Sequence, residues 1–429
     1  MSNSTIISIQ ARETFSDSGY PSVEVVVKTS NGKTGYGRCS EYYSTSSYKP
    51  LYLYDGGERF HGLGVSKAAE LINNVLAPSL IGMDAVEQAL ADEKIKDIMH
   101  TNGIPSYVNV SSPVSTAILN AGATSTGIPL YRHIGGQSAF TVPLMGHLIA
   151  SGSKRYGTDN VAKGRPFYHL VAYDFPTLED AHYALWEVAN SYEKVISREI
   201  HYVTHRGFSM AIPKNKIEND YVLWDAIETS IEESGYKGRI GIHVDIGANE
   251  YYNTETGLYE GLFDDKPKTR EELIAIEKKM ASEYSFIIMN DPLYEDDLEG
   301  YAELVKDTKI QITGDDICSS NYDRITYCIT HGCINSVVIP VNRFDTFSDA
   351  LRVVRFAKSH GVDIMVRDAC GEEYDACAYA IGFNAGTIYG CGLNPHGNQI
   401  LCMAADIGPR CKFYGKGGLQ GEKFSLKGV

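Results

Sequence analysis

Three apolar runs in the second half of the chain each end in acidic or amide side chains. They are "GIHVD", ending at Asp245, "FIIMND", ending in Asn290 and Asp291, and "IQITGDD", ending in Asp315 and Asp316. Carboxylate and amide oxygens that approach from three directions suit a hard octahedral cation such as Mg²⁺. The same residue types also cap helices, so the spacing alone leaves open a metal site and a set of helix caps.

The elements that would position these side chains alternate between strand and helix from about residue 142. Two further apolar runs end in polar residues, "SVVIPVN" at Asn342 and "DIMVRD" at Asp368, and helical patterns lie between the runs. One such helix begins at Thr269, which forms a capping box with Glu272. Intervals of roughly 25 to 45 residues between strands predict parallel β/α units, arranged as a barrel rather than an open sheet. Because the carboxyl ends of barrel strands meet at one mouth, we expect Asp368 and the three groups above to face a common site.

The first third of the chain has a different pattern, which is typical of a small α+β unit. The segment "PSVEVVVKTSNGKTGYGR" predicts two strands joined at Asn31-Gly32, whose residues tolerate the positive backbone angles of a tight hairpin. Ser66 is placed to cap the helix that follows. Since 429 residues also exceed what one core usually organises, we expect two domains, residues 1–136 and residues 142–429.

Composition limits the partners and the compartment. The chain has a formal net charge of -15 and no local basic patch, which argues against binding to nucleic acid or to an anionic membrane. Nine cysteines without a Cys-x-x-Cys pair fit a reducing cytosol better than a disulfide framework. The N-terminus has no signal-peptide pattern, and no run of about 18 apolar residues is present to span a bilayer. These features predict a soluble cytoplasmic protein.

Long segments of the chain resemble the enolase family. Near the N-terminus, "ARETFSDSGYPSVEVVV" is similar to the enolase string "AREIFDSRGNPTVEVDV". In the second half, "DPLYEDDLEGYAEL" is similar to "DPFDQDDWEAW", and "QITGDDICSSNYDRI" is similar to "QVVGDDLTVTNPKRI". The resemblance covers nearly the whole chain and implies an α/β protein of the enolase type, with an N-terminal α+β cap domain followed by a C-terminal β/α (TIM-like) barrel. It also implies a Mg²⁺ site whose ligands fall on Asp245, Asn290 and Asp315, and a homodimer or higher homo-oligomer.

Several positions that carry the enolase reaction differ in this chain. Asn290 stands where the family has the Glu of "SIEDP", which predicts weaker Mg²⁺ binding, with either Asn290 or Asp291 completing the site. The family's base, the Lys of "LLKVNQ", falls on Pro340, and its second Lys, in "GQIKTG", falls on Tyr389. The general-acid Glu aligns near Phe208. Proline has no proton to move, and a tyrosine with a normal pKa of about 10 does not replace a cation.

The residues that would hold a phosphorylated substrate are also changed. The family string "SHRSGE" becomes "RDACGE", which places Asp368 and Cys370 at the positions of His and the second Ser, and an Asp there would repel a phosphate. Ser40 matches a loop Ser that helps to hold a second Mg²⁺, but Glu41 replaces the glycine that allows this loop to close. Lys154 falls at the His position of a further substrate loop.

Loss of base, partner lysine, acid and phosphate clamp together argues against efficient dehydration of 2-phosphoglycerate, since each such group commonly contributes about a hundredfold or more in rate. We expect a repurposed Mg²⁺-dependent lyase, dehydratase or isomerase that acts on a small carboxylate through an enediolate. Two arginines near the predicted mouth, Arg343 and Arg367, could instead pair with local acids such as Asp345 or Asp363. A lone histidine such as His205 is often structural. The candidate catalytic groups are Asp368, Tyr389, Arg343, Arg367 and His205, with Lys154 and Cys370 in substrate loops.

Two other hypotheses stay open on the sequence alone. The chain could be a catalytically inactive enolase-fold protein that binds a ligand or joins an oligomer. Its 29 tyrosines, several of them between Tyr42 and Tyr54, would suit a recognition loop or ordinary packing. It could also be a working phosphopyruvate hydratase of glycolysis whose acid is misaligned near Phe208. The stretch around Pro340 aligns without a gap and does not permit such an error at the base.

Overall fold

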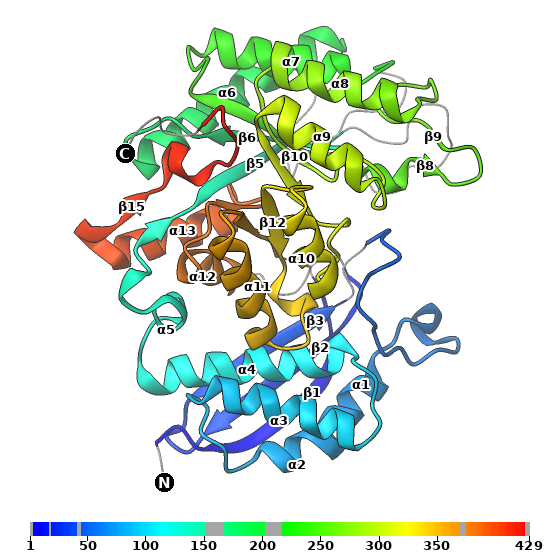
Figure 1. Ribbon diagram of the computed structural model, residues 1–429. Helices are drawn as coiled ribbons and strands as arrows, with labels where there is room; N and C mark the ends of the chain where they lie inside the picture. The colour runs from blue at the N-terminus through cyan, green and yellow to red at the C-terminus, as the bar shows by residue number, and fades with distance from the viewer. Residues whose placement is uncertain are drawn as a thin grey trace.

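The computed structural model describes residues 3–16, 19–40, 44–151, 166–201, 217–368 and 375–424. Within these residues an N-terminal unit built on a three-stranded sheet packs below a barrel, and helix α4 (Val108–Thr126) lies between the sheet and the barrel (Figure 1). Each unit has its own cluster of buried apolar side chains. The fold is therefore α/β, with a small α+β unit followed by a β/α barrel, as the sequence predicts.

The sheet of the N-terminal unit is antiparallel. Gly32, between its second and third strands, has a φ of +76°, which confirms the predicted tight hairpin. Ser66 is the first residue of helix α1 and not its cap, because the Asp55 carboxylate accepts the backbone N–H groups of Ser66 and Lys67 in place of a local cap. The elements are β1 (Ile6–Phe15), β2 (Pro21–Thr29), β3 (Thr34–Ser40), α1 (Ser66–Leu71), α2 (Ala77–Leu80), α3 (Gln88–Thr101) and α5 (Leu130–Gly135).

Strand β3 approaches α4 so closely that two of its residues must be glycine. A Cβ atom at Gly35 would lie 2.2 Å from the backbone nitrogen of Ala121. One at Gly37 would lie 2.1 Å from the carbonyl oxygen of Pro113. Because backbone atoms stand on the other side of both contacts, only residues without a side chain allow this packing. The end of β3 is thereby fixed against the helix that faces the barrel.

Eight strands close the barrel in the order β10-β11-β12-β13-β14-β5-β6-β7. Strand β6 is antiparallel to both of its neighbours, whereas the other neighbouring pairs are parallel. The expectation of uniformly parallel β/α units is therefore wrong for β6, which two helices, α6 and α7, join to the antiparallel strand β7. The strands are β5 (Leu144–Ser151), β6 (Phe167–Ala172), β7 (Ile240–Asp245), β10 (Phe286–Asn290), β11 (Gln311–Gly314), β12 (Ser336–Ile339), β13 (Asp363–Val366) and β14 (Thr387–Ile388).

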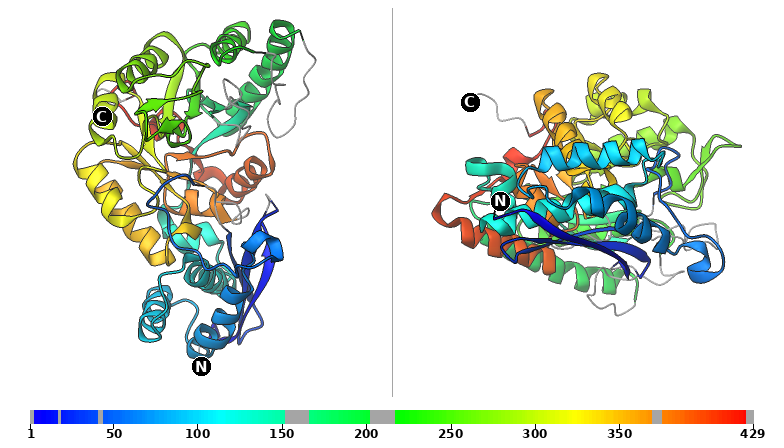
Figure 2. Two further views of the ribbon diagram at one scale, coloured as in Figure 1. Left: turned by 90° about the vertical axis from the view of Figure 1, so that its right-hand side faces the viewer. Right: turned by 90° about the horizontal axis from the view of Figure 1, so that it is seen from below.

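Helices cover the outside of the barrel (Figure 2). They are α6 (Leu178–Glu199), α7 (Tyr221–Glu233), α8 (Arg270–Glu283), α9 (Leu298–Thr308), α10 (Tyr322–Thr330), α11 (Phe347–Ser359), α12 (Asp375–Gly382) and α13 (Pro395–Ile407). Most begin with a side chain that accepts a backbone N–H of the first turn, which satisfies a donor that the helix itself leaves open. The predicted capping box of Thr269 and Glu272 at the start of α8 is confirmed.

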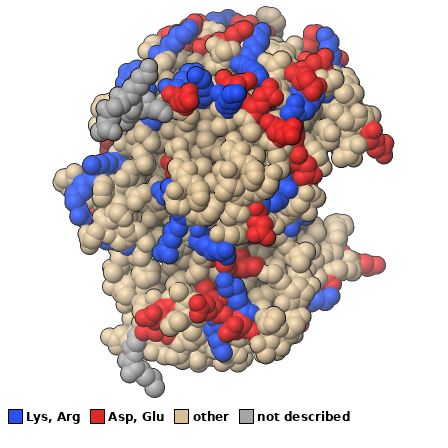
Figure 3. Space-filling model, in the orientation of Figure 1, with Lys and Arg blue, Asp and Glu red and all other residues tan. Residues whose placement is uncertain are grey.

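Two small two-stranded sheets are present besides the barrel and the three-stranded sheet. Strands β4 (Thr141–Val142) and β15 (Lys412–Phe413) pair in parallel, and β8 (Tyr252–Asn253) pairs with β9 (Leu258–Tyr259). Acidic and basic side chains are interspersed over the face shown in Figure 3. Among the residues that the structure describes, no helix combines the length and the apolar character that a membrane crossing requires.

Candidate functional site

The predicted polar strand ends lie together at the mouth of the barrel. Asp245 is the last residue of β7, Asn290 is the last residue of β10, and Asp315 directly follows β11. Asn290 is in register with Asp245 on one side and with Thr313 on the other. All three strand-end side chains are buried. The strand pattern therefore brings the three predicted ligand residues side by side.

A guanidinium group lies between the two aspartates. Arg367 directly follows β13, and its Nη1 forms an ion pair with Asp315 Oδ2 and lies 3.9 Å from Asp245 Oδ2. Arg343, in the turn η5 (Val341–Arg343), also approaches Asp315, with 3.5 Å between Nη1 and Oδ1. The side chains of these four residues, which we call the mouth network, are between 1% and 6% exposed. Water screens such buried charges little, so their mutual attraction is strong.

Tyr389 contacts both an aspartate and an arginine of the mouth network. Its hydroxyl donates a hydrogen bond of 2.8 Å to Asp245 Oδ2. The guanidinium carbon of Arg367 lies 4.3 Å from the centroid of its ring. A guanidinium on an aromatic face is held by the ring quadrupole and by stacking. Tyr389 therefore fixes the relative positions of Asp245 and Arg367.

A neighbouring histidine engages the Asn290 amide. The amide Oδ1 lies 3.2 Å from His243 Nε2, and the amide Nδ2 lies 3.7 Å from Met365 Sδ. Burial lowers the pKa of His243 to about 3, so its ring is neutral and can donate through Nε2–H to the amide oxygen. His169 stacks on His243 with 4.7 Å between ring centroids, and burial lowers the pKa of His169 as well. The amide oxygen that a metal ion would need is thus already an acceptor.

Asp291, the other candidate for the third ligand, closes the turn after β11. Its carboxylate accepts backbone N–H groups from Asp315 at 3.0 Å, from Asp316 at 2.8 Å and from Ile317 at 3.3 Å. Its backbone φ is +43°, a value that Asp adopts more readily than most residues. Both carboxylate oxygens therefore serve the backbone of this turn, which leaves Asn290 as the residue that faces Asp245 and Asp315.

A loop of the N-terminal unit is hydrogen-bonded to acids on the rim of the barrel. The Ser44 hydroxyl donates to Asp316 Oδ1 at 2.6 Å. The Ser47 hydroxyl and backbone N–H donate to Glu295 Oε1 at 2.6 Å and 3.0 Å. We call Asp291, Glu295 and Asp316 the latch carboxylates. Asp291 accepts hydrogen bonds from the turn after β11, and Glu295 and Asp316 accept hydrogen bonds from the N-terminal loop, so the three acids hold these segments on the barrel.

The other predicted site residues have varied positions. Ser40 is buried at the end of β3, next to Cys39, whose thiol donates to the Asn342 carbonyl of the barrel at 3.2 Å. Asp368 directly follows Arg367, and its Oδ2 lies 3.8 Å from His396 Nε2. The predicted residues His205, Lys154 and Cys370, and the loosely aligned Phe208, lie outside the described residues.

Two histidines near the mouth were not predicted from the strand ends. His243 precedes Asp245 by two residues in "GIHVD", and alternate residues of a strand face the same side. A search with that period along each strand would have found it. His396 lies at the start of α13, far along the sequence from Asp368, and no local pattern marks it.

The donor set at the mouth does not fit a divalent cation in this arrangement. Asp315 is paired with Arg367, and the Asn290 oxygen accepts from His243. Within the described ranges, no group of three or more His, Cys, Asp or Glu side chains has an arrangement that could hold a metal ion. A divalent cation would have to displace a guanidinium from between Asp245 and Asp315, so no catalytic step through Mg²⁺ follows from these positions.

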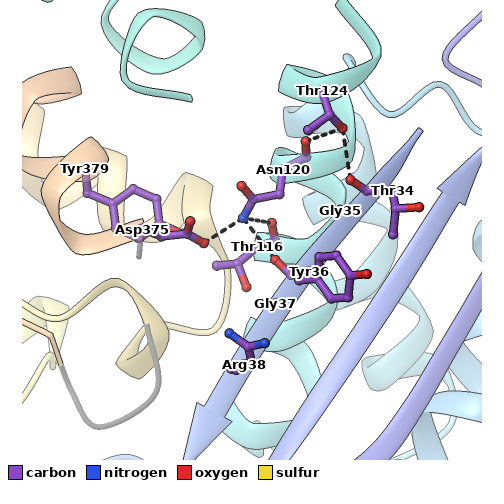
Figure 4. Close-up of a pocket in the computed structure, with 10 residues that line it drawn as sticks. All are labelled: Thr34, Gly35, Tyr36, Gly37, Arg38, Thr116, Asn120, Thr124, Asp375 and Tyr379. Atoms are coloured by element: carbon purple, nitrogen blue, oxygen red, sulfur yellow. Dashed lines mark hydrogen bonds between the residues drawn. The ribbon is translucent and has the colours of Figure 1, made fainter. Parts of the chain in front are cut away.

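A cavity of about 340 Å³ lies at the seam between the two units, lined by β3, α4 and α12 (Figure 4). Asn120 Nδ2 donates to Asp375 Oδ2 at 2.7 Å and to the Tyr36 carbonyl at 3.0 Å. Burial raises the pKa of Asp375 to about 6. The polar groups of this cavity bond to one another across the seam, which is typical of a domain junction.

The fold and the mouth together define a class of protein. A closed barrel with charged side chains at the carboxyl ends of its strands, beside a small α+β unit, is the architecture of two-domain barrel enzymes and their relatives. Two sequence-family descriptions match the two units. "Enolase, N-terminal domain" matches residues 6–134, and "Enolase, C-terminal TIM barrel domain" matches residues 173–420. The chain belongs to the enolase family.

Curated relatives named enolase extend over almost the whole chain. The protein from Methanopyrus kandleri is 29% identical over 431 residues, which cover 95% of this chain and 99% of the relative. The protein from Pyrococcus furiosus is 31% identical over 396 residues, or 89% of each chain, and that from Natranaerobius thermophilus is 30% identical over 395 residues, or 90% of each. Such similarity establishes the family and the fold and leaves many positions changed.

Proposed function

We propose that this enolase-family protein binds a small carboxylate without phosphate at the barrel mouth and is not an efficient 2-phosphoglycerate dehydratase. The observation that carries the proposal is the mouth network, in which Arg367 and Arg343 both pair with Asp315. Guanidinium groups match carboxylates in shape and charge, so a carboxylate ligand can exchange with Asp315 as their partner.

The chemistry of the enolase reaction supports the proposal that this protein does not dehydrate 2-phosphoglycerate efficiently. That reaction removes a proton next to a carboxylate, and Mg²⁺ compensates the charge that develops. By resemblance the base falls on Pro340, which has no basic side chain, and a phosphate would meet Asp368. Without base and phosphate clamp, a loss of at least about a hundredfold in rate is expected.

Altered chemistry is a second candidate, and the contact between Asp368 and His396 favours it. Their side chains lie 3.8 Å apart next to Arg367. A carboxylate beside an imidazole can orient the ring. His396 would then remove a proton that Pro340 cannot accept, in a lyase or isomerase acting on the same carboxylate.

The first experiment measures conversion of 2-phosphoglycerate to phosphoenolpyruvate with excess Mg²⁺, beside an active enolase as control. We expect kcat/KM at least about a hundredfold below the control. A value within about tenfold of the control would contradict the proposal.

The second experiment titrates lactate, glycerate and 2-phosphoglycerate into the protein by calorimetry. We expect binding of the unphosphorylated acids and at least about tenfold weaker binding by Arg343→Gln, since a charge-assisted bond is lost. Arg352→Gln is the matched control, because Arg352 stacks on Tyr322 outside the mouth network. Equal affinities for the two variants would reject the site.

The second candidate has its own test. Exchange of the proton next to the carboxylate is followed in D₂O by NMR, for the parent and for His396→Ala. The candidate predicts exchange in the parent and its loss in the variant with binding retained. Equal exchange in both proteins would reject the role of His396.

A further inference from the structure

We propose that the Arg367 guanidinium is the built-in cation of this site and takes the place that a divalent ion would need between Asp245 and Asp315. Its Nη1 is paired with Asp315 Oδ2 and lies 3.9 Å from Asp245 Oδ2. Both carboxylates converge on this one nitrogen, as two ligands converge on a metal ion. The inference holds whichever ligand or reaction the mouth supports.

The formal charges of the surrounding side chains agree with this role. The mouth network contains two carboxylates, Asp245 and Asp315, and two guanidinium groups, Arg343 and Arg367, so its formal charge is zero. Asn290, which lies in register with Asp245, contributes none. A carboxylate at position 290 would add one more negative charge to a buried site that already adjoins Asp291 and Asp316, and burial of an uncompensated charge is strongly unfavourable. The neutral amide of Asn290 therefore keeps the charge of the site in balance with its two arginines.

The surroundings also hold the guanidinium in place. The ring of Tyr389 stacks on Arg367, while the hydroxyl of Tyr389 bonds to Asp245. Arg343 contacts the second oxygen of Asp315, which orients that carboxylate toward Arg367. Arginine suits this position better than lysine, because only its planar group stacks on a ring and pairs with a carboxylate at the same time. A cation that entered would have to break these contacts together.

The proposal is tested by calorimetric titration of Mg²⁺ into the parent and three variants at constant ionic strength. Arg367→Met removes the internal cation, Asn290→Glu with Arg367→Met adds a third carboxylate as well, and Arg367→Lys keeps the charge as the matched control. We expect no specific binding to the parent or to Arg367→Lys. Binding should appear in Arg367→Met and become at least about tenfold tighter in the double variant, because affinity rises with the number of carboxylate ligands.

Two results of this titration would overturn the proposal. One is Mg²⁺ binding to the parent as tight as that to the double variant. The other is the absence of binding to a folded double variant, because its three carboxylates would then not form the site that Arg367 is proposed to fill.

The parent protein offers a test that does not depend on the folding of the Arg367 variants. Free Mn²⁺ is measured by electron paramagnetic resonance in solutions of the parent and of Asp245→Asn. The proposal predicts the same free Mn²⁺ signal with both proteins. One bound Mn²⁺ per chain in the parent that is lost in Asp245→Asn would overturn it.

Discussion

Two groups of buried acids lie close together in this protein and are stabilised in different ways. The latch carboxylates accept hydrogen bonds from neutral donors, as Asp291 does from three backbone N–H groups and Asp316 from Ser44. In the mouth network, by contrast, Asp315 is paired with the charged groups of Arg343 and Arg367. The first arrangement fixes a turn and a loop, whereas the second concentrates opposite charges at a barrel mouth.

The difference separates structural acids from acids of a binding site. A carboxylate whose oxygens are bonded to backbone N–H groups is committed to one conformation. A carboxylate paired with an arginine can exchange that partner for a ligand or an ion of suitable charge. Asp291 and Asp315 both follow predicted strands, yet only Asp315 is paired with guanidinium groups that could bind a carboxylate ligand in its place.

The largest expected effect is that of Arg367→Met on stability. Removing the guanidinium takes away the cation that lies between the buried Asp245 and Asp315, which should lower the free energy of unfolding by about 3–5 kcal/mol. Urea unfolding at pH 7 measures the change. Arg367→Lys, which keeps the charge, should lose less. Equal stability of Arg367→Met and the parent would remove the distinction between the two groups of acids.

Asp291→Asn tests the latch in the same way. The amide nitrogen of the new side chain would face a backbone N–H, such as that of Asp316, so one donor would lose its acceptor. We expect a loss of about 2 kcal/mol in the free energy of unfolding, since a buried unsatisfied donor costs about 1–3 kcal/mol. Asn also tolerates the positive φ at this position, which isolates the hydrogen-bond effect. A gain of Mg²⁺ binding by this variant would contradict the structural role.

Glu277 is a third kind of buried acid, because among the described residues neither a hydrogen-bond donor nor an arginine contacts its carboxylate. No hydrogen bond reaches its carboxylate from the residues that the structure describes, and burial, with the nearby Asp297, raises its pKa well above the usual value. The native state therefore holds the proton that the unfolded chain releases above about pH 4.5. Stability from this group is fully present below that pH and falls as the pH rises toward the native pKa.

The substitution Glu277→Gln should remove this loss of stability at high pH. We expect the variant to be more stable than the parent by about 1–2 kcal/mol at pH 8, with the difference vanishing near pH 4, because a neutral amide is cheaper to bury than a charge. Urea unfolding across this pH range measures it. Glu271→Gln on the same helix is the control, since Glu271 is 76% exposed and should change little. A parent and a Glu277→Gln variant with parallel pH profiles would contradict the argument.

The smallest expected effect is that of Ser44→Ala in the latch. Loss of the hydroxyl bond to Asp316 should reduce the free energy of unfolding by about 1 kcal/mol. Thr45, whose hydroxyl lies 3.3 Å from the same carboxylate, provides the control Thr45→Ser, which keeps the donor. Ligand and Mg²⁺ titrations should be unchanged in both variants. A change in either titration would mean that the latch is part of the binding site.

Local patterns in the sequence predicted the positions of several elements. Asn31-Gly32 predicted a hairpin, the pair Thr269 and Glu272 predicted a helix start, and runs that end at Asp245 and Asp315 predicted strands that meet at one mouth. Each of these signals lies within a few residues of the chain. Each signal depends on a local property: the backbone angle of a turn residue, a side chain that caps a helix, or a short apolar run that is buried.

The pairings that define the site could not be predicted in this way. Arg367 and Asp315 are 52 positions apart, and their ion pair depends on which side chains reach across the barrel. The antiparallel direction of β6 and the remote capping of Ser66 by Asp55 also depend on tertiary contacts. Strand ends therefore located the site, while the identity of its internal cation required the three-dimensional arrangement.

A crystal structure of the parent protein grown with Mn²⁺, with an anomalous difference map at the manganese edge, would show directly whether Arg367 or a metal ion lies between Asp245 and Asp315. We expect guanidinium density between Asp245 and Asp315 and no anomalous peak between these two side chains. A manganese peak bonded to both aspartates, with Arg367 displaced, would contradict it.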